Sequence, residues 1–268
     1  MARKGMGTLE IIVLLKHVPS TEAIIDIADD GRSAKLDGVK KVINPYDEYA
    51  IEEALKIKEA HGGSVVVVSA GDEKAADGVQ TALAMGADKG VVINDPLMGE
   101  HGALKTAKIL SELLKTLPYD LIIAGQRAVD SDNGQVAGAV AEYLDIPSIS
   151  MVIKQDITDG VIRCLKSVEG GTVLLEAPLP ILFTTQRGLN EPRYASLPGI
   201  MKAKRKPMEI KTPAEWGIDV DSFEAPTVKI VTLTHPVERT GGEIIDGDSP
   251  EEKVDKLVRA LHEKERLF

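Results

Sequence analysis

The stretch "YDLIIAGQRAVDSDNGQVAGAVAEYL", Tyr119 to Leu144, joins an apolar run, a polar loop and a run with helical spacing. The apolar run ends at Gly125 and is typical of a strand buried on both faces. The run from Gly134 onward repeats small and apolar residues as a helix packed on a core does. A strand that passes through a loop into a helix is the repeating unit of open α/β sheets, so this stretch decides the fold.

The same unit recurs through the first half of the chain. Asn44 is the predicted N-cap of one helix, with Pro45 at its first position. Continuous apolar strands that alternate with helices predict an α/β fold with a doubly wound, mainly parallel sheet. The further strands are expected at 9–16, 64–71 and 89–94, and the helices at 44–60, 73–87 and 103–117.

The alternation of strand and helix patterns ends after Pro147. Strands joined by turns at 159–160 and 170–171 predict antiparallel additions to the sheet. The chain from 188 to 213 is expected to be irregular and basic, and "TVKIVTL", 227–233, is a predicted short strand. We therefore divide the chain into an α/β domain and a C-terminal helical arm, at 1–225 and 226–268.

The C-terminal arm contains a clear helix signal. Ser249 is a predicted N-cap, Pro250 stands at the first helical position, and two glutamates follow in the first turn. Apolar residues recur along one side of this helix, which leaves open whether it packs on its own domain or on another subunit.

Composition excludes several classes of protein. The 268 residues have a net charge of −10, which argues against a nucleic-acid-binding protein. Cys164 is the single cysteine, so no internal disulfide forms, and a reducing cytoplasm, or equally an organelle matrix, is expected. No apolar run reaches the roughly 20 residues of a membrane span, so direct membrane insertion is not expected.

Catalytic motifs are missing from the sequence. The five histidines do not stand at metal-ligand spacing, and no GxSxG, Walker A or HExxH motif occurs. We therefore predict no catalytic side-chain constellation and no metal site, and leave open whether the chain is part of an enzyme.

Three segments are expected to meet beyond the carboxyl ends of the strands, where α/β sheets bind ligands. They are the end of the first strand near Leu14, the "NPYD" turn at 44–47 and the loop at 125–136. In that loop, Asp132 and Gln135 have the spacing of a capping box. This pattern predicts a helix start that holds a phosphate on main-chain amides.

The amides of Gly134, Gln135 and Val136 are the expected phosphate donors, with Asp130 free to accept from a ribose or from loop amides. Two other interpretations stay open. Asp132 could only cap the helix while Asp130 is a solvated turn residue, or the "DSD" sequence could hold Mg²⁺ alongside substrate phosphates.

A basic cluster, 201–206, follows the sequence "LPG". The turn is expected to present Leu197 outward. The cluster is either a solvated surface loop or the rim of a partner-docking site anchored by this leucine.

Several blocks resemble the beta subunit of electron transfer flavoprotein. They include "VINPYDEYAIEEALKIKE", "GQRAVDSDNGQVAG" and "LNEPRYASLPGIMKAKRK", in the family's order and spacing from about Leu9 to the C-terminal helix. The resemblance implies a heterodimer whose alpha subunit carries an FAD that this chain helps to enclose, with the arm packed on that subunit. It also implies electron transfer between flavoenzymes of the acyl-CoA dehydrogenase type and a downstream acceptor.

The resemblance further implies an adenine-nucleotide pocket in this chain, filled by AMP in simple carriers and by a second FAD in electron-bifurcating members. Ser131, Gln135 and Val136 are similar to the bifurcating pattern, whereas "NDPLMGEHGALKTAKIL" lacks the Asp-Thr-x-Ala-Thr sequence expected beside such a flavin. FAD is modestly favoured. The complex would then be an oxidoreductase that bifurcates electrons from NADH.

The residues carried over from the family fall in two sets. The cofactor-binding set is Leu14, Asn44, Pro45, Tyr46, Asp47, Ala70, Gly125, Gln126, Arg127, Ala128, Val129, Asp130, Ser131, Asp132, Asn133, Gly134, Gln135 and Val136. The partner-docking set is Tyr194, Leu197, Pro198, Ile200, Met201, Lys202 and Lys204. Gly199 stands where the mitochondrial-type sequence has asparagine, and glycine is expected to loosen the loop tip.

A second class of protein shares the predicted topology. It is a free-standing ATP- or AMP-binding regulatory domain of the stress-protein type, which would form homodimers. The "LNEPRYASLPGIMKAK" block argues against it, because such a domain has no use for a docking loop.

Overall fold

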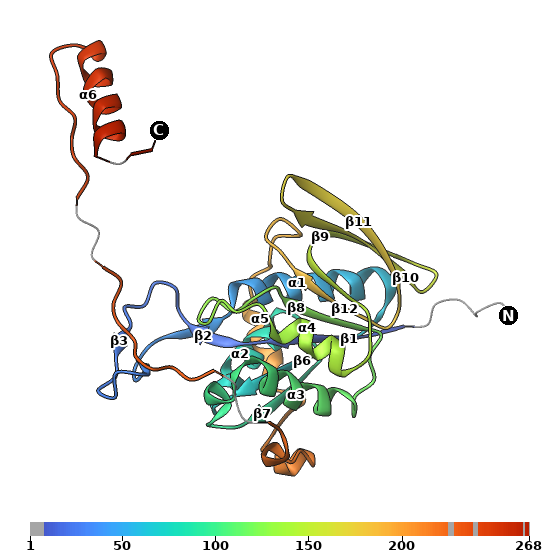
Figure 1. Ribbon diagram of the computed structural model, residues 1–268. Coiled ribbons are helices and arrows are strands. Elements are labelled where there is room, and N and C mark those ends of the chain that lie inside the picture. The colour runs from blue at the N-terminus through green and yellow to red at the C-terminus, as the bar shows by residue number, and fades with distance from the viewer. Residues whose placement is uncertain (1–7, 225–227, 238–240, 265, 268) are drawn as a thin grey trace.

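The computed structural model describes residues 8–224, 228–237, 241–264 and 266–267. A nine-stranded sheet runs through its centre in the order β11-β10-β9-β12-β8-β1-β6-β7-β13 (Figure 1). The predicted α/β fold with a mainly parallel sheet is confirmed. The parallel strands include β1 (Leu9–Leu15), β6 (Gly63–Gly71), β7 (Lys89–Asn94), β8 (Leu121–Gly125), β12 (Ile181–Thr185) and β13 (Met208–Lys211).

Helices cover both faces of the sheet, as the alternating strand and helix patterns predict. The side chains of β1 explain the two layers, since Ile11 and Val13 point into one core cluster and Ile12 and Leu14 into the other. One face carries α1 (Pro45–His61), α2 (Ala75–Met85) and α5 (Leu197–Ala203), and the other α3 (Gly102–Leu114) and α4 (Val136–Tyr143).

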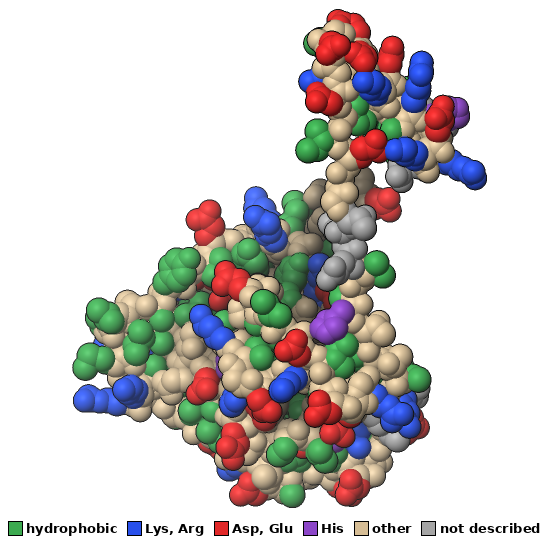
Figure 2. Space-filling model, turned by 90° about the vertical axis from the view of Figure 1, so that its left-hand side faces the viewer, with side chains coloured by type: hydrophobic (Ala, Val, Ile, Leu, Met, Phe, Trp, Pro, Cys, Tyr) green, Lys and Arg blue, Asp and Glu red, His purple; other side chains and the backbone are tan. Residues whose placement is uncertain are grey.

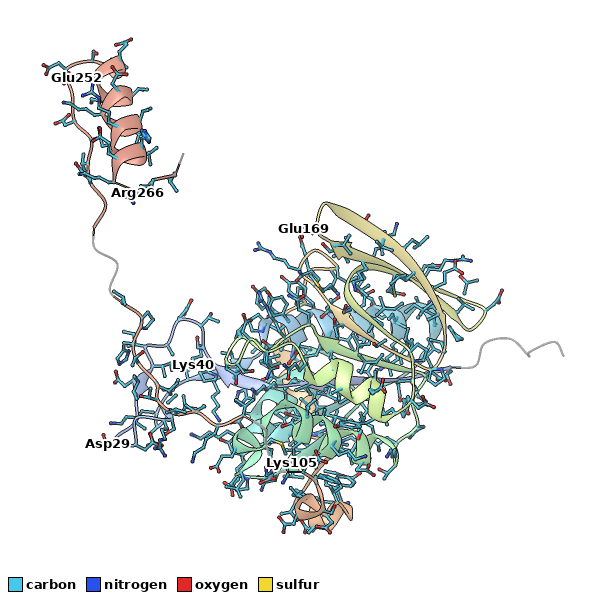
Figure 3. The ribbon with its side chains drawn as sticks, viewed as in Figure 1. Asp29, Lys40, Lys105, Glu169, Glu252 and Arg266 are labelled. Carbon is cyan, nitrogen blue, oxygen red and sulfur yellow. The ribbon has the colours of Figure 1, made fainter. Side chains whose placement is uncertain are left out.

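Antiparallel strands extend one side of the sheet. β9 (Ser148–Thr158), β10 (Val161–Val168) and β11 (Gly171–Pro178) form this addition. β9 joins the sheet in parallel with β12, and the antiparallel pairs are β9 with β10 and β10 with β11. The predicted turns are confirmed, and Glu169 marks the turn between β10 and β11 (Figure 3). Cys164 is fully buried in β10, and burial raises the pKa of its thiol to about 12, which makes it an unreactive core residue.

The chain between β1 and α1 makes an excursion that no sequence pattern predicts. Two short antiparallel pairs build it, and Asp29 and Lys40 lie on it (Figure 3). The pairs are β2 (His17–Pro19) with β5 (Lys41–Ile43), and β3 (Asp26–Ile27) with β4 (Ala34–Lys35).

The segment from 188 to 213 is more regular than expected. It contains α5 and the edge strand β13, which pairs in parallel with β7. Single-turn 3₁₀ segments lie outside this segment, at η1 (Met98–Glu100), η2 (Ala214–Trp216) and η3 (Val220–Ser222).

The C-terminal arm ends in α6 (Pro250–Glu263), which Figure 1 draws apart from the α/β layers. The predicted cap is confirmed, because the Ser249 hydroxyl accepts the N–H of Glu252 at 3.2 Å. Glu252 and Arg266 mark this arm in Figure 3.

The predicted strand in the arm is wrong for residues 228–233, which are irregular, and Thr227 lies outside the described residues. The N–H of Leu233 donates to the carbonyl of Gly31 at 2.8 Å. The Arg32 Nε donates to the carbonyl of Val231 at 3.3 Å. Alternating apolar residues form a strand only beside a ladder partner, and these isolated contacts do not supply one. Residues 1–7 and 225 of the proposed domain, and 226, 238–240, 265 and 268 of the arm, also lie outside the described residues.

Candidate functional site

A buried carboxylate joins two strand ends at the carboxyl edge of the sheet. Asp47 lies in the first turn of α1; its Oδ2 accepts the N–H of Lys16 at 2.7 Å and its Oδ1 that of Gly125 at 3.0 Å. The ends of β1 and β8 are thereby held against α1. A Cβ at position 125 would overlap Asp47 Oδ1 and Tyr46, so only glycine fits there.

The ionisation of Asp47 is balanced between burial and hydrogen bonding. Burial raises the pKa of this carboxyl to about 7, while hydrogen bonds from the amides of Lys16 and Gly125 and from Asn44 act in the opposite direction. Its oxygens are occupied by protein donors. Asp47 therefore has a structural role, because it holds the strand ends below the candidate site.

Asn44 has a different role from the predicted N-cap. α1 does begin at Pro45, but the Asn44 side chain makes no capping hydrogen bond. Its Nδ2 donates to the carbonyl of Arg127 at 2.9 Å, and its Oδ1 accepts the N–H of Val129 at 3.2 Å. The Asn44 side chain thus binds main-chain groups 83 and 85 positions away in the sequence. It thereby joins the loop after β8 to the start of α1.

The predicted capping box of Asp132 and Gln135 is wrong. Asp132 has a left-handed backbone with φ 54°, and its carboxylate pairs with the guanidinium of Arg127, with Nε and Oδ1 3.1 Å apart. Arg127 also donates to the Tyr46 hydroxyl at 3.1 Å and lies over that ring. The carboxylate of Asp132 therefore binds the Arg127 guanidinium in place of the main-chain amides of the helix. The three-residue spacing of Asp132 and Gln135 does not reveal this pairing.

Asp130 is held by a cation too. Its Oδ2 lies 2.7 Å from Lys16 Nζ, so it is an exposed turn residue, as one interpretation expects, but its carboxylate is paired and is not a free acceptor. Both loop aspartates are thus paired with basic side chains, which disfavours the magnesium interpretation. Among the described residues, no group of three or more histidine, cysteine or acidic side chains is arranged to hold a metal ion.

The start of α4 carries main-chain donors without partners. No side chain caps this helix, and within the described residues the N–H groups of Gly134, Val136 and Ala137 have no hydrogen-bond acceptor. Only the Gln135 N–H is engaged, by Asn133 Oδ1 at 3.3 Å. Loop residues 130–135, which include Gly134 and Ser131, are exposed and Val136 is half-buried, whereas Ala137 is buried, so the accessible donors are those of Gly134 and Val136.

A cavity of about 490 Å³ adjoins the same loop. It shares three residues with the predicted set, whereas Leu14, Asn44 and Ala70 lie outside its lining. Its remaining lining comes from Gly138 in α4, from β9 and β12, and from Gln186 just after β12, none of which is among the predicted residues. The lining residues are Gln126, Arg127, Gly134, Gly138, Ser148, Ile149, Ser150, Met151, Leu182, Thr184 and Gln186.

A signal for this cavity was not readable in the sequence. Met151 adopts φ 61°, unusual for a residue with a side chain, and its N–H donates to the hydroxyl of Thr184 at 3.0 Å. Leu14 is buried in the core, and Ala70 lies one residue beyond the end of β1, because Leu15 pairs with Ser69. The predicted lining residues are therefore distributed around the strand ends.

Figure 2 looks onto the side of the molecule toward which β1 runs, where acidic, basic and hydrophobic side chains are mixed. A second cavity, of about 440 Å³, lies between the β2–β5 pair and α2, with Lys41, Lys74 and Asp77 among its lining residues. None of the predicted site residues lines it.

The predicted docking residues lie on and around a short helix. The turn expected at Leu197 is the start of α5, whose N-cap Ser196 accepts the N–H of Gly199 at 3.1 Å. The expected outward position of Leu197 is confirmed, since it is 81% exposed, with Tyr194 and Met201 at 97% and 74%. Pro198, Ile200, Lys202 and Lys204 are exposed as well.

Gly199 does not loosen this segment. A Cβ at this position would overlap the carbonyl oxygen of Ala84 at the end of α2. The missing side chain lets α5 approach α2 closely, so the glycine is a packing residue.

The fold and the site at the edge of the sheet define an open, doubly wound α/β protein. Its main-chain N–H donors at the start of α4, unpaired within the described residues, lie beyond the carboxyl ends of the strands. Residues 35–216 match the family model of the electron transfer flavoprotein domain. The chain is 39% identical to the electron transfer flavoprotein subunit beta of Bacillus subtilis over 261 residues, which are 97% of this chain and 100% of that protein. It is 33% identical to the human subunit beta over 255 residues, 94% of this chain and 98% of that protein.

The chain belongs to the electron transfer flavoprotein family, among its beta subunits. Membership implies a flavoprotein that transfers electrons and a heterodimer with an alpha subunit. In the described part of the chain, no helix combines the length and the apolar character needed to cross a bilayer.

Proposed function

We propose that this beta subunit binds an adenine nucleotide at the carboxyl edge of its sheet, with the phosphate on the main-chain donors at the start of α4. The observation that carries this proposal is that α4 begins without a side-chain cap and with accessible N–H groups that lack acceptors. Each such donor favours an anion only modestly, so several must act together.

The acidic side chains beside these donors support the loop and do not repel the ligand. Asp130 is neutralised by Lys16 and Asp132 by Arg127, while Asp47 is buried beneath the strand ends. The loop that would surround the phosphate is therefore pinned to α1 by Asn44 and to β1 by Lys16. A preformed loop loses less conformational entropy when a ligand binds.

The nucleotide is FAD in preference to AMP, and a second flavin would make the complex an electron-bifurcating oxidoreductase that takes electrons from NADH. Support comes from the resemblance of the loop sequence "DSDNGQVAG" to the bifurcating pattern. A cavity of about 490 Å³ next to the loop offers space beyond that of a phosphate.

The alpha subunit carries the electron-transferring FAD, and this chain completes that site and packs its arm on the alpha subunit. Apolar residues exposed on α6 fit this assignment, namely Val254, Leu257 and Val258. The docking helix α5 meets flavoenzymes of the acyl-CoA dehydrogenase type through Leu197. A reducing compartment such as the cytoplasm is the proposed location.

The test is the identity and number of nucleotides released from the purified heterodimer. Two FAD per heterodimer support the bifurcating form, and one FAD with one AMP supports the simple carrier. A heterodimer that holds flavin only in its alpha subunit and releases no second nucleotide contradicts the proposed site. A free-standing regulatory domain would instead form homodimers, which native mass spectrometry of the chain alone detects.

A further inference from the structure

The docking helix α5 is too short to be stable by itself. It has seven residues, and isolated helices below about 12 residues are marginal in water. Much of its apolar surface, at Leu197 and Met201, faces solvent and adds nothing to its stability in the free protein. Contacts with the rest of the protein must therefore hold it, namely the packing of Gly199 and Ala203 and the attachment of the chain at its two ends.

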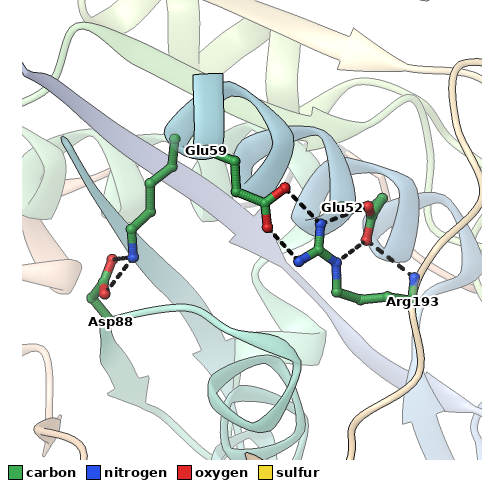
Figure 4. A network of polar contacts seen from close by, with 5 residues as sticks. Glu52, Glu59, Asp88 and Arg193 are labelled. Carbon is green, nitrogen blue, oxygen red and sulfur yellow. Dashed lines mark hydrogen bonds and ion pairs between the residues drawn. The ribbon is translucent and has the colours of Figure 1, made fainter. Parts of the chain in front are cut away.

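The chain entering α5 is fixed to α1 by Arg193. Its guanidinium binds the buried carboxylate of Glu52 with two hydrogen bonds, Nε to Oε2 at 2.8 Å and Nη2 to Oε1 at 3.0 Å, and its main-chain N–H adds a third at 3.1 Å (Figure 4). The same guanidinium binds Glu59, two turns along α1, with Nη1 and Oε1 2.6 Å apart. Arg193 thus spans two carboxylates on one face of α1.

A neighbouring amide strengthens this attachment. Asn190 Nδ2 donates to Glu53 Oε2 at 2.8 Å and to the carbonyl of Tyr49 at 3.0 Å. On its other side, α1 is fixed by Lys58, whose Nζ lies 2.6 Å from Asp88 Oδ1. Figure 4 labels Asp88 at this attachment. Asp88 Oδ2 also accepts the N–H of Val65 in β6. α1 is therefore a platform held on the sheet.

The chain leaving α5 is fixed to α2 by Lys206. Its Nζ donates to the carbonyl of Leu83 at 3.0 Å and to that of Ala87 at 2.6 Å, at the C-terminal end of α2. Carbonyls at the end of a helix lack helical partners and favour a cation. Between these two anchors, Gly199 lies against Ala84.

We propose that Arg193 and Lys206 are positioning residues that hold α5 in its helical form between α1 and α2, so that Leu197 and Met201 stand ready to meet a partner flavoenzyme. This inference rests on the proposed docking function. Its physical basis is that a partner binding only the formed helix loses apparent affinity in proportion to the fraction of molecules in which the helix is unformed.

The two anchors make different chemical demands. A lysine at position 193 keeps the charge but cannot bridge Glu52 with a planar fork. The matched control is Arg163→Lys, because Arg163 pairs with Glu176 across β10 and β11, far along the sheet from α5. A Lys206→Met variant loosens α5 from the opposite end.

The test uses the flavin-loaded heterodimer, reduced by an acyl-CoA dehydrogenase and its acyl-CoA, with hydrogen exchange of residues 197–203 measured in parallel. We expect Arg193→Lys and Lys206→Met to speed exchange in α5 and to raise the KM for the heterodimer about tenfold, at unchanged kcat and nucleotide content. Arg163→Lys should change none of these quantities. If Arg193→Lys does not yield a folded complex, the Lys206→Met result decides.

Two results overturn the inference. One is unchanged exchange in α5 in these variants, and the other is faster exchange with an unchanged KM while Leu197→Ala raises the KM. An unchanged KM in Leu197→Ala itself overturns the docking function, and the positioning role with it. The Leu197→Ala measurement therefore separates failure of the inference from failure of the proposed function.

Discussion

Asp47 Oδ1 accepts the main-chain N–H of Gly125 at 3.0 Å, although the two residues stand 78 positions apart in the chain. This hydrogen bond holds the first turn of α1 against the end of β8. Asn44, three residues earlier, binds the loop that follows Gly125. The geometry of the proposed nucleotide site therefore depends on side chains that need not touch the nucleotide.

Substitution of Gly125 by alanine should destabilise the heterodimer by roughly 1–3 kcal/mol, because the new Cβ overlaps Asp47 Oδ1 and Tyr46. The measurement is urea unfolding of the purified complex. Gly171→Ala is the matched control, since a Cβ there meets no atom within 4 Å. Equal stability of the two variants would contradict the close packing at position 125.

Substitution of Asn44 by alanine should release the proposed nucleotide. The change removes the hydrogen bonds to Arg127 and Val129 and leaves the loop free of α1. Two hydrogen bonds at about 1 kcal/mol each predict a rise in the nucleotide Kd of roughly tenfold or more. Calorimetric titration of the nucleotide-free heterodimer measures it, and an unchanged Kd would show that the loop keeps its form without Asn44.

The stability of the protein should depend on pH through Asp47. Because the pKa of this carboxyl is raised from 3.8 to about 7, the folded chain retains a proton that the unfolded chain releases. Its contribution to stability is therefore full below about pH 4 and is lost as the pH rises to about 7. Unfolding free energies of wild type and Asp47→Asn should be compared across this range.

The difference, wild type minus Asp47→Asn, should fall with rising pH by up to roughly 4 kcal/mol. The subtraction removes the opposite contribution of carboxyls such as Glu59, whose pKa is lowered by its hydrogen bond from Arg193. A difference that stays level, or that grows with pH, would show that Asp47 is ionised throughout the range.

Substitution of Leu197 by alanine should weaken electron exchange with a dehydrogenase and leave nucleotide content unchanged. Burial of one leucine on a partner is worth about 1.5–3 kcal/mol, so the KM should rise roughly ten- to hundredfold. Leu174→Ala on β11 is the control, because Leu174 is also an exposed leucine, at 62%. Loss of bound nucleotide in Leu197→Ala would mean that α5 belongs to a different site.

The fold was largely predictable because a strand that is buried on both faces has a continuous apolar sequence. The apolar runs of β1, β6, β7 and β8 each match a predicted strand to within two residues at either end. The strands of the short pairs β2–β5 and β3–β4 have no recognisable sequence pattern, because two or three residues are too few to show a periodicity. β13, which has four residues, was not predicted either.

The proposed site was predictable only in outline. Chain order placed Asn44 and the loop at 125–136 at one sheet edge, because parallel strands end together. Which side chain pairs with which was not predictable. Asp132 binds Arg127 and Asn44 binds the loop, where local spacing predicts two helix caps.

By itself, the sequence determined the alternation of buried strands and amphipathic helices, and with it the parallel sheet and the edge at which a ligand would bind. Those properties depend on residues close together in the chain, through the periods of strand and helix. Only the tertiary structure decided the partners of Asp47, Asp130 and Arg193, because each partner comes from a distant segment. Hydrogen bonds and ion pairs form between whatever groups folding brings within about 3 Å, and that distance has no counterpart in sequence spacing.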